Sequence, residues 1–265
     1  MNKKHREENL NDLNTYLIPR ANGDTEEELA FKFSEPNNTN SKNGEIECCF
    51  RDLEKHLINK IKQYPVVVGC IAWLTNKRIL KALATKEAVS IIIQKEDFLR
   101  PDSDNWSGIK LRKLYSQLPH GVIKYDENNT QWGEIINRLS TSYSWETRAV
   151  RWMGNFNTEK NPAFPRMHNK FLVFCDIKKV KKIERFPGKS YEYESHHIMP
   201  KALWTGSFNL THNATCSLEN AVFIKNEEIV KSYYNEWQYI FALSETIEEI
   251  DWAGNWDVPG FRIGT

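Results

Sequence analysis

The stretch "MHNKFLVF", residues 167–174, ends like a buried strand but begins with two reactive side chains. Its apolar second half, residues 171–174, is typical of a strand that lies inside a sheet. Residues two apart in an extended chain point to the same face, so His168 and Lys170 are expected side by side. An imidazole and an ammonium held together at the start of a buried strand predict a chemical site at that end.

Apolar runs alternate with helical periodicities along most of the chain. Strands are expected at 65–73, 88–94, 121–125, 148–153, 170–175, 202–205 and 218–224, and helices at 50–64, 76–84, 105–118, 132–139 and 226–247. The alternation predicts an α/β fold, a layered α/β/α sandwich with a mixed, largely parallel sheet.

The composition divides the chain into three parts. Residues 1–46 are expected to form a polar N-terminal arm, which ends in the loop-like "SEPNNTNSKNGE" and docks through Leu29, Phe31 and Phe33. Residues 47–243 form the main domain, and residues 244–265 a Trp-rich C-terminal tail. A basic segment at about 177–201 is inserted in the domain. It is either a solvated hairpin or loop, or a basic lip that meets phosphates through Lys178, Lys179, Lys181 and Lys182.

The overall charge excludes a globally basic nucleic-acid-binding protein. The chain of 265 residues carries 36 basic and 35 acidic residues, and 40% of it is hydrophobic, which is ample for a core. Five cysteines without CxxC spacing indicate reduced thiols, and neither a signal peptide nor an apolar span is evident. We therefore expect a soluble, cytoplasmic protein that does not act in the membrane.

Three further polar residues follow the histidine and the lysine in order. "WTGSFNLT" (204–211) offers Ser207 and Asn209, which share a face if the chain is extended there, and "SLENAVFI" (217–224) places Glu219 before another apolar run. The glycine before Ser207 is expected to let the backbone approach a ligand closely.

These residue types suit phosphodiester chemistry. Lysine, serine and asparagine supply a cation and directed donors for the oxygens on which charge grows. Neutral imidazole is a competent nucleophile toward phosphorus, and a carboxylate such as Glu219 orients it. A second imidazole is needed to protonate the leaving oxygen.

The ordered set His168-x-Lys170, Gly206-Ser207-x-Asn209 and Glu219-Asn220 resembles the HKD motif of the phospholipase D superfamily, in its single-motif, nuclease-like members. The resemblance covers residues 47–243. It implies a metal-independent phosphodiesterase without cofactor, expected to be a DNA endonuclease, that works through a covalent phosphohistidine. It also implies a site shared across a homodimer, DNA rather than RNA as substrate, and an ATPase or helicase partner in bacterial restriction or anti-phage defence.

The sequence departs from that family at two places. The aspartate that follows the motif lysine by five residues is replaced by Cys175, and Asp176 comes one position late, which in a strand turns it to the other face. A structural role for Asp176 through a bulge stays open, and we do not assign it to catalysis. The inserted segment 177–201 is the second departure.

Other functions remain open from sequence alone. The same residues would serve a lipid phosphodiesterase or a phosphatidyl transferase, and a catalytically silent dimer that binds nucleic acid is a further alternative. His196, His197, His212 and Cys216 match no usual zinc spacing. Trp132, Trp145, Trp152 and Trp204 fit core packing better than stacking on bases.

Overall fold

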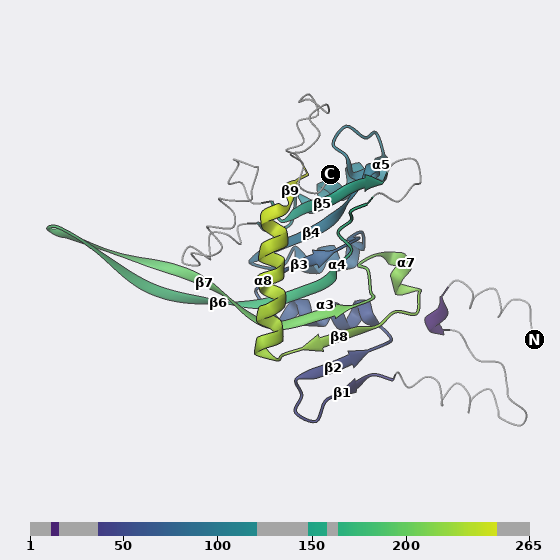
Figure 1. Cartoon of the computed structure of the whole chain (residues 1–265), viewed down its shortest axis with the longest axis horizontal. Helices are drawn as coiled ribbons and strands as arrows, with labels where there is room; N and C mark the ends of the chain where they lie inside the picture. Colours follow the sequence, from purple (N-terminus) through teal and green to yellow (C-terminus); the bar gives the residue numbers. More distant parts are fainter. Residues whose placement is uncertain (1–11, 16–36, 121–147, 158–163, 248–265) are drawn as a thin grey trace, which may run out of the picture.

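The computed structural model describes residues 12–15, 37–120, 148–157 and 164–247, shown as coloured ribbon in Figure 1. The expected strand at 121–125, the expected helix at 132–139 and the docking residues Leu29, Phe31 and Phe33 lie outside these ranges, as does almost all of the Trp-rich tail. Within the described ranges, no helix is long and apolar enough to cross a membrane.

One sheet of nine strands organises the described chain. The strands are β1 (Thr39–Asn40), β2 (Ile46–Cys49), β3 (Val66–Ile71), β4 (Ala88–Glu96), β5 (Val150–Asn157), β6 (Lys170–Phe186), β7 (Lys189–Gly206), β8 (Ala221–Ile224) and β9 (Glu245–Thr246). Their order across the sheet is β1-β2-β8-β7-β6-β3-β4-β5-β9. Every expected strand that falls on described residues is present.

The sheet is mixed, but the expectation that it is largely parallel is wrong. Only β3 with β4 and β4 with β5 pair in parallel among the described strands, while the other six pairings are antiparallel. The reason is connectivity: β6 turns directly into β7, and the short segment from β7 to β8 holds only a single helical turn. Parallel neighbours need a longer crossover.

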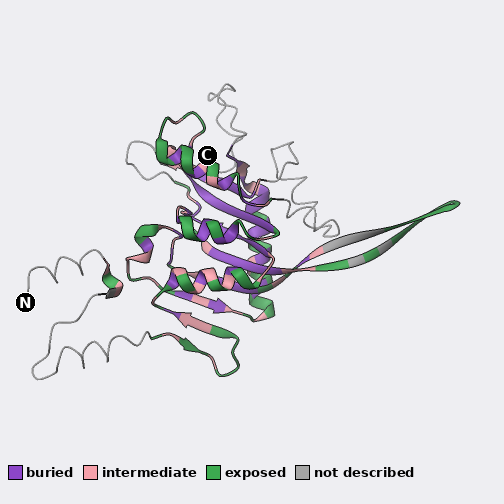
Figure 2. Cartoon of the chain, turned by 180° about the vertical axis from the view of Figure 1, so that it is seen from behind, coloured by how far each residue is buried: buried purple, intermediate pink, exposed green. Residues whose placement is uncertain are grey.

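Helices cover both faces of the sheet, as the α/β/α expectation requires (Figures 1 and 2). On one face α3 (Leu53–Gln63), α4 (Lys77–Leu83) and α5 (Trp106–Tyr115) bury apolar side chains in the larger core. On the other face lies α8 (Glu227–Leu243), which contributes Val230, Trp237 and Phe241 to a second core. β3 separates the two cores, because its residues alternate between them.

The inserted segment is a β-hairpin that projects far beyond the sheet (Figure 1). β6 pairs with β3 only as far as Cys175, and from Ile177 onward its partner among the described strands is β7. The register shifts between Phe174 and Cys175, where Pro200 replaces the residue that would continue the ladder. Proline in a sheet is found at such bulges because it donates no hydrogen bond. We call residues 177–201 the β-arm.

The end of the expected N-terminal arm belongs to the sheet. β1 and β2 form a hairpin that pairs with β8. Within the described part of "SEPNNTNSKNGE", which is expected to be loop, only Thr39 and Asn40 belong to a strand, and residues 41–45 form the turn of the hairpin. Further upstream, the 3₁₀ turn η1 (Leu13–Thr15) docks on α7 (His212–Thr215), where the Asn14 side chain donates to the carbonyl of Thr215 over 2.9 Å.

Candidate active site

Three segments meet at the end of the sheet from which β6 starts. His168 and Asn169 lie just before β6, and the N–H of Ala72, after β3, donates to the carbonyl of Asn169 over 2.9 Å. The segment after β7 is tied to the same place, because Leu210 donates to the carbonyl of Trp73 over 3.0 Å. The structure thus gathers residues from three strand ends, at the end of the sheet where the parallel strands β3 and β4 finish.

His168 and Lys170 are adjacent, as the two-residue spacing predicts. The Lys170 Nζ lies 3.2 Å from Nε2 and 3.5 Å from Nδ1 of the His168 ring, and it donates to the His168 carbonyl over 3.1 Å. Partial desolvation lowers the pKa of His168, and the positive charges of Lys170 and Arg166 lower it further. The imidazole is therefore biased toward its neutral form, which is the nucleophilic one.

Lys170 carries its charge in a partly buried position. Burial lowers its pKa, and the negative charge of Glu219 opposes that shift. Glu219 is thus the carboxylate whose charge favours the protonated form of Lys170.

The indole of Trp73 packs against the imidazole. The two rings meet edge to face, with centroids 5.8 Å apart and planes at 82°. The indole is fixed in turn, because its Nε1 donates to Glu96 at the end of β4 over 2.6 Å. A ring held by its own hydrogen bond restricts the orientations that are open to His168.

A buried glutamine binds the backbone of the residue that precedes His168. Gln94 on β4 accepts from the N–H of Met167 over 2.8 Å, and its amide donates to the carbonyls of Lys95 and Asn155 over 2.9 and 2.6 Å. Gly154 makes room for it: its φ is +92°, and a Cβ there would lie 2.5 Å from the Gln94 oxygen. The residue before His168 is thus fixed by a side chain that is 2% exposed.

Ser207 is held by the carboxylate expected to orient the histidine. Its hydroxyl hydrogen-bonds Glu219 and lies 2.9 Å from Asn220 Oδ1, while the N–H of Asn220 donates to Ser207 Oγ over 3.1 Å. A hydroxyl has one hydrogen, so it donates to one of the two oxygens at a time. Within the described chain Glu219 therefore contacts Ser207 rather than His168.

Gly206 serves the sheet rather than a ligand. A Cβ at this position would lie 2.2 Å from the carbonyl oxygen of Asn220 and 2.7 Å from the Cα of Ala221. The expectation that this glycine makes room for a ligand is thus replaced by a contact between β7 and the start of β8. That contact brings Ser207 next to Glu219.

Asn209 presents an unused hydrogen-bonding group. Its Oδ1 is buried and has no hydrogen-bond partner among the described residues. Asn209 lines an open hollow of about 460 Å³ together with Trp73, His212 and Glu219. A polar atom that is buried without a partner is costly unless a ligand or water satisfies it.

The structure separates the other predicted residues from this constellation. Asp176 is six residues along β6 from Lys170, and its charge acts on Tyr64 near the opposite end of the sheet. The side chains of Lys178, Lys179 and Lys181 are exposed on the β-arm, and Lys182 lies on the same strand. At roughly 3.3 Å per residue, Lys178 is more than about 25 Å from Lys170 along the strand. Within one chain these four lysines do not form a lip beside His168.

The sequence did not indicate that Trp73 and Gln94 position His168. Trp73 lay in a predicted buried strand and Gln94 at the end of another, where each was read as part of the core. A polar Gln94 closing the run "AVSIIIQ" was the available signal, because a buried amide needs hydrogen-bond partners.

One group of side chains elsewhere has donor types suited to a metal. Glu47, Cys49 and His56 bring ligand atoms within 4.8 Å of one another. The carboxylate is already neutralised, because Lys60 pairs with Glu47 over 2.5 Å and also lies 4.2 Å above the Phe223 ring. This group is on β2 and α3, apart from His168, and we assign no metal to it.

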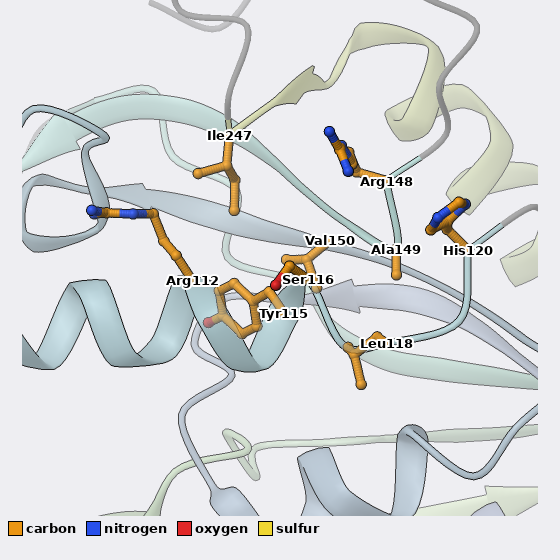
Figure 3. Close-up of a pocket in the computed structure, with 9 residues that line it drawn as sticks. All are labelled: Arg112, Tyr115, Ser116, Leu118, His120, Arg148, Ala149, Val150 and Ile247. Carbon is orange, nitrogen blue, oxygen red and sulfur yellow. The ribbon is translucent and has the colours of Figure 1, made fainter.

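A small pocket beside β5 is also separate from the candidate site (Figure 3). It holds about 50 Å³, with Arg112, Tyr115 and Val150 in its wall. β5 lies three strands from β6 in the sheet. His120 and Arg148, which also line the pocket, border the segment 121–147 outside the described residues, so we assign it no role.

A histidine beside a lysine, with serine and asparagine from a neighbouring strand end, on a three-layer α/β sandwich, defines an enzyme that acts on phosphodiesters. The comparisons with known proteins agree. Residues 56–241 match the family described as "Cardiolipin synthase, PLD-like domain", and the chain belongs to this phospholipase D-like family of phosphodiester-acting enzymes.

The chain is also similar to individual proteins. A protein of Acanthamoeba polyphaga mimivirus, L381, is 31% identical over 207 residues, which is 74% of this chain and 65% of the viral protein. The chain thus spans less than two thirds of that relative. Among solved structures, NucT from Helicobacter pylori matches with 14% identity and a TM-score of 0.41, covering 76% of this chain and 98% of NucT. Nuc from Salmonella typhimurium, a phospholipase D family member, matches with 16% identity and a TM-score of 0.40, covering 76% and 95%.

Proposed function

We propose that the protein is a metal-independent nuclease that cleaves DNA through a covalent phosphohistidine, in a site completed by a second copy of the chain. The observation that carries the proposal is the 3.2 Å contact between Lys170 Nζ and the ring of His168, whose neutral form is favoured. This contact supports the proposal because a nucleophile and a cation for the phosphate oxygens are needed side by side. As expected from the resemblance, we also propose an effector role in restriction or anti-phage defence, with an ATPase or helicase partner.

The first step is an in-line displacement at phosphorus. A ring nitrogen of His168 forms the P–N bond while the bond from phosphorus to the leaving oxygen breaks. Lys170, Ser207 and Asn209 bind the equatorial oxygens as their charge grows. Before Ser207 can donate to a phosphate oxygen, its hydroxyl must turn away from Glu219, which it contacts in the free protein.

The leaving oxygen needs a proton, and we assign this proton to His168 of the partner subunit. Two copies related by a two-fold axis would bring equivalent residues together at that axis. In the second step water attacks phosphorus and gives a proton to the imidazole of the partner's His168, which lost its own proton in the first step. The P–N bond to the first His168 breaks at the same time. Glu219 remains our candidate for orienting a histidine, here the partner's His168, because in its own chain it contacts Ser207.

The test is cleavage of plasmid and single-stranded nucleic acids in excess EDTA. Wild-type protein should cut and His168→Ala should not, and an acid-labile phosphate adduct should map to His168 by mass spectrometry. The matched control is His120→Ala, an exposed histidine beside β5 that should cut like wild type. Cleavage by His168→Ala would overturn the mechanism. Hydrolysis of phosphatidylglycerol vesicles in place of nucleic acid would favour a lipid phosphodiesterase.

A mixing experiment tests the shared site. If each site needs His168 from both copies, activity in re-equilibrated mixtures with His168→Ala should fall as the square of the wild-type fraction. A linear fall would show that one chain holds a complete site.

A further inference from the structure

The β-arm has a charge that differs from the rest of the chain. Residues 177–201 contain seven lysines and arginines against three glutamates, whereas the whole chain is almost balanced at 36 basic and 35 acidic residues. The remainder of the protein is therefore net acidic. The lysine and arginine side chains described on the arm are exposed, from Lys178 through Arg185 to Lys189 and Lys201. A positive projection on an otherwise slightly acidic body is complementary to a polyanion.

Protection of free strand edges does not account for this charge. Beyond Cys175 the outer edges of β6 and β7 have no partner among the described strands, and charged side chains on such edges hinder unwanted strand pairing. Either sign of charge would serve that purpose. One ion pair on the arm joins Lys181 to Glu192 over 3.2 Å, and both side chains are largely exposed, so this pair contributes little. With seven basic residues against three glutamates, the arm keeps a positive net charge whichever of them pair.

The shape of the arm matches a groove of duplex DNA. Two strands about 4.8 Å apart make a narrow ribbon, and ten residues from Ile177 to Phe186 extend it by roughly 33 Å. The major groove of B-DNA, about 12 Å wide, admits a two-stranded β-ribbon, and one helical turn is about 34 Å long. The major groove of duplex RNA is deep and narrow and excludes side chains.

The tip of the arm carries apolar groups suited to a groove. Phe186 and Tyr191 are 56% and 54% exposed, and their rings meet edge to face with centroids 6.0 Å apart. Gly188 forms the turn with φ +79°. Exposed rings on a structured tip offer apolar contact to thymine methyl groups, while the neighbouring Arg185 and Lys189 lie within reach of phosphates.

We propose that the β-arm binds double-stranded DNA in its major groove, as a second contact separate from the catalytic residues. The arm leaves the sheet at the end opposite to α7, which follows the Ser207–Asn209 segment (Figure 1). The arm therefore sets affinity and preference for duplex DNA and leaves the chemical step alone. The proposal rests on the proposed nuclease function for its choice of polyanion.

The experiment measures binding without cleavage, in full-length His168→Ala protein. Fluorescence anisotropy with labelled 30-base-pair DNA, duplex RNA of the same sequence and single-stranded DNA is recorded over a range of salt. The test variant adds Lys178→Gln, Arg185→Gln and Lys189→Gln, and the control variant adds Lys113→Gln, Lys225→Gln and Lys231→Gln, three exposed lysines on the body.

The arm variant should bind duplex DNA about tenfold or more weakly than the control, and its salt slope should fall by roughly 2 to 3, near 0.9 for each lost phosphate contact. Duplex RNA should bind weakly and respond equally to both variants. Equal DNA affinity of the two variants, equal dependence of duplex RNA on the arm, or a change of oligomeric mass without a change of DNA affinity would each overturn the proposal.

A second assay distinguishes failure of the β-arm proposal from failure of the proposed nuclease function. In the His168-containing background, hydrolysis of bis(p-nitrophenyl) phosphate reports the chemistry alone. The arm variant should hydrolyse this small diester at the wild-type rate. Loss of hydrolysis in both variants would point to misfolding, which their melting temperatures detect, and the arm is then tested by Phe186→Ser with Tyr191→Ser under the same criteria.

Discussion

The amide of Met167 donates a hydrogen bond of 2.8 Å to the side chain of Gln94, so a buried glutamine on β4 fixes the residue that precedes His168. The side-chain NH2 of Gln94 in turn donates to the carbonyl of Asn155 on β5 over 2.6 Å. The position of His168 is therefore set by a neighbouring region of the sheet and not by its own strand alone.

Replacing this glutamine should damage catalysis more than binding. Gln94→Met keeps the volume but removes three hydrogen bonds, which lets the Met167 segment shift. We expect kcat to fall about 10- to 100-fold, since a misplacement of about 1 Å has such effects, with KM changed less than about threefold. Steady-state kinetics on a small diester provides the measurement.

The control for this variant lies on the same strand. Ser90 is 3% exposed, and its hydroxyl has no partner among the described residues, so Ser90→Ala should leave both kcat and melting temperature unchanged. If Gln94→Met lowers the melting temperature but keeps kcat and the His168 imidazole signals in the NMR spectrum, the glutamine has only a structural role.

The Trp73 indole should hold the imidazole of His168 in its orientation by packing against it. Trp73→Ala removes the ring that meets His168 edge to face and should lower kcat strongly, whereas Trp73→Phe keeps a ring and loses only the hydrogen bond to Glu96. We expect a loss of several-fold for phenylalanine and of roughly 100-fold for alanine. Glu96→Gln retains an acceptor for the indole and should stay near wild type; equal loss in all three variants would contradict this role.

The cation beside His168 should be visible in its titration. Partial burial comes first and Lys170 second among the causes that lower the pKa of His168. Lys170→Met removes a positive charge that disfavours the imidazolium, so the pKa should rise toward the ordinary histidine value, while the effect of burial remains. Imidazole NMR titration measures this directly.

The lowered pKa of His168 has a consequence for the pH profile of cleavage. A lowered pKa keeps the nucleophile neutral to lower pH, so the acid limb of wild-type cleavage should lie below the ordinary histidine range. Lys81→Met, which removes an exposed lysine of α4, should not move the His168 titration. A fall in the His168 pKa on Lys170→Met would refute the electrostatic assignment.

Removing one partner of a buried ion pair should destabilise the protein more than removing one partner of a surface pair. Lys95 is 2% exposed and pairs with Glu245 of β9 over 2.9 Å. Glu245→Ala leaves a buried ammonium unpaired and should reduce the free energy of unfolding by about 3 kcal/mol, the low end for such changes because Glu245 is 31% exposed. Urea denaturation is the measurement.

Two variants complete that comparison. Lys95→Met should be much less harmful than Glu245→Ala, because it removes the charge as well as the pair. Arg78→Ala breaks an ion pair with Glu54 in which the arginine is 80% exposed, and should change the free energy of unfolding by less than about 1 kcal/mol. Similar losses for all three variants would argue against a special role for the buried pair.

Local patterns were enough to predict most elements and the gathering of the motif residues. The buried runs around residues 66–71 and 170–175 are strands, and the two-residue spacings place His168 beside Lys170. Sequence could not predict the pairing direction of β6, because direction depends on connection and not on side-chain pattern. It also placed the arm lysines near the site, since a hairpin and a lip have the same composition.

The residues that position His168 could not be predicted from the sequence for a different reason. Gln94 and Met167 are 73 positions apart in the chain, and the hydrogen bond between them arises only once β4, β5 and the segment before β6 are assembled. Glu219 was expected to orient the histidine of its own chain or of a partner, because a carboxylate fixes the tautomer and orientation of an imidazole. The close approach of β7 and β8 at Gly206 instead sets Glu219 against Ser207.

The outermost strands of the sheet, β1 and β9, are two residues long each. Such short edge strands expose few unpaired amides and carbonyls. Outside the β-arm, the sheet therefore offers almost no free strand edge to which another chain could add a strand. Two copies of the protein that come together are then expected to meet through side chains at the strand ends or over the helices, and not as one continuous sheet. An association of that kind would not use the free strand edges of the β-arms, so both arms would stay available to contact a long polymer.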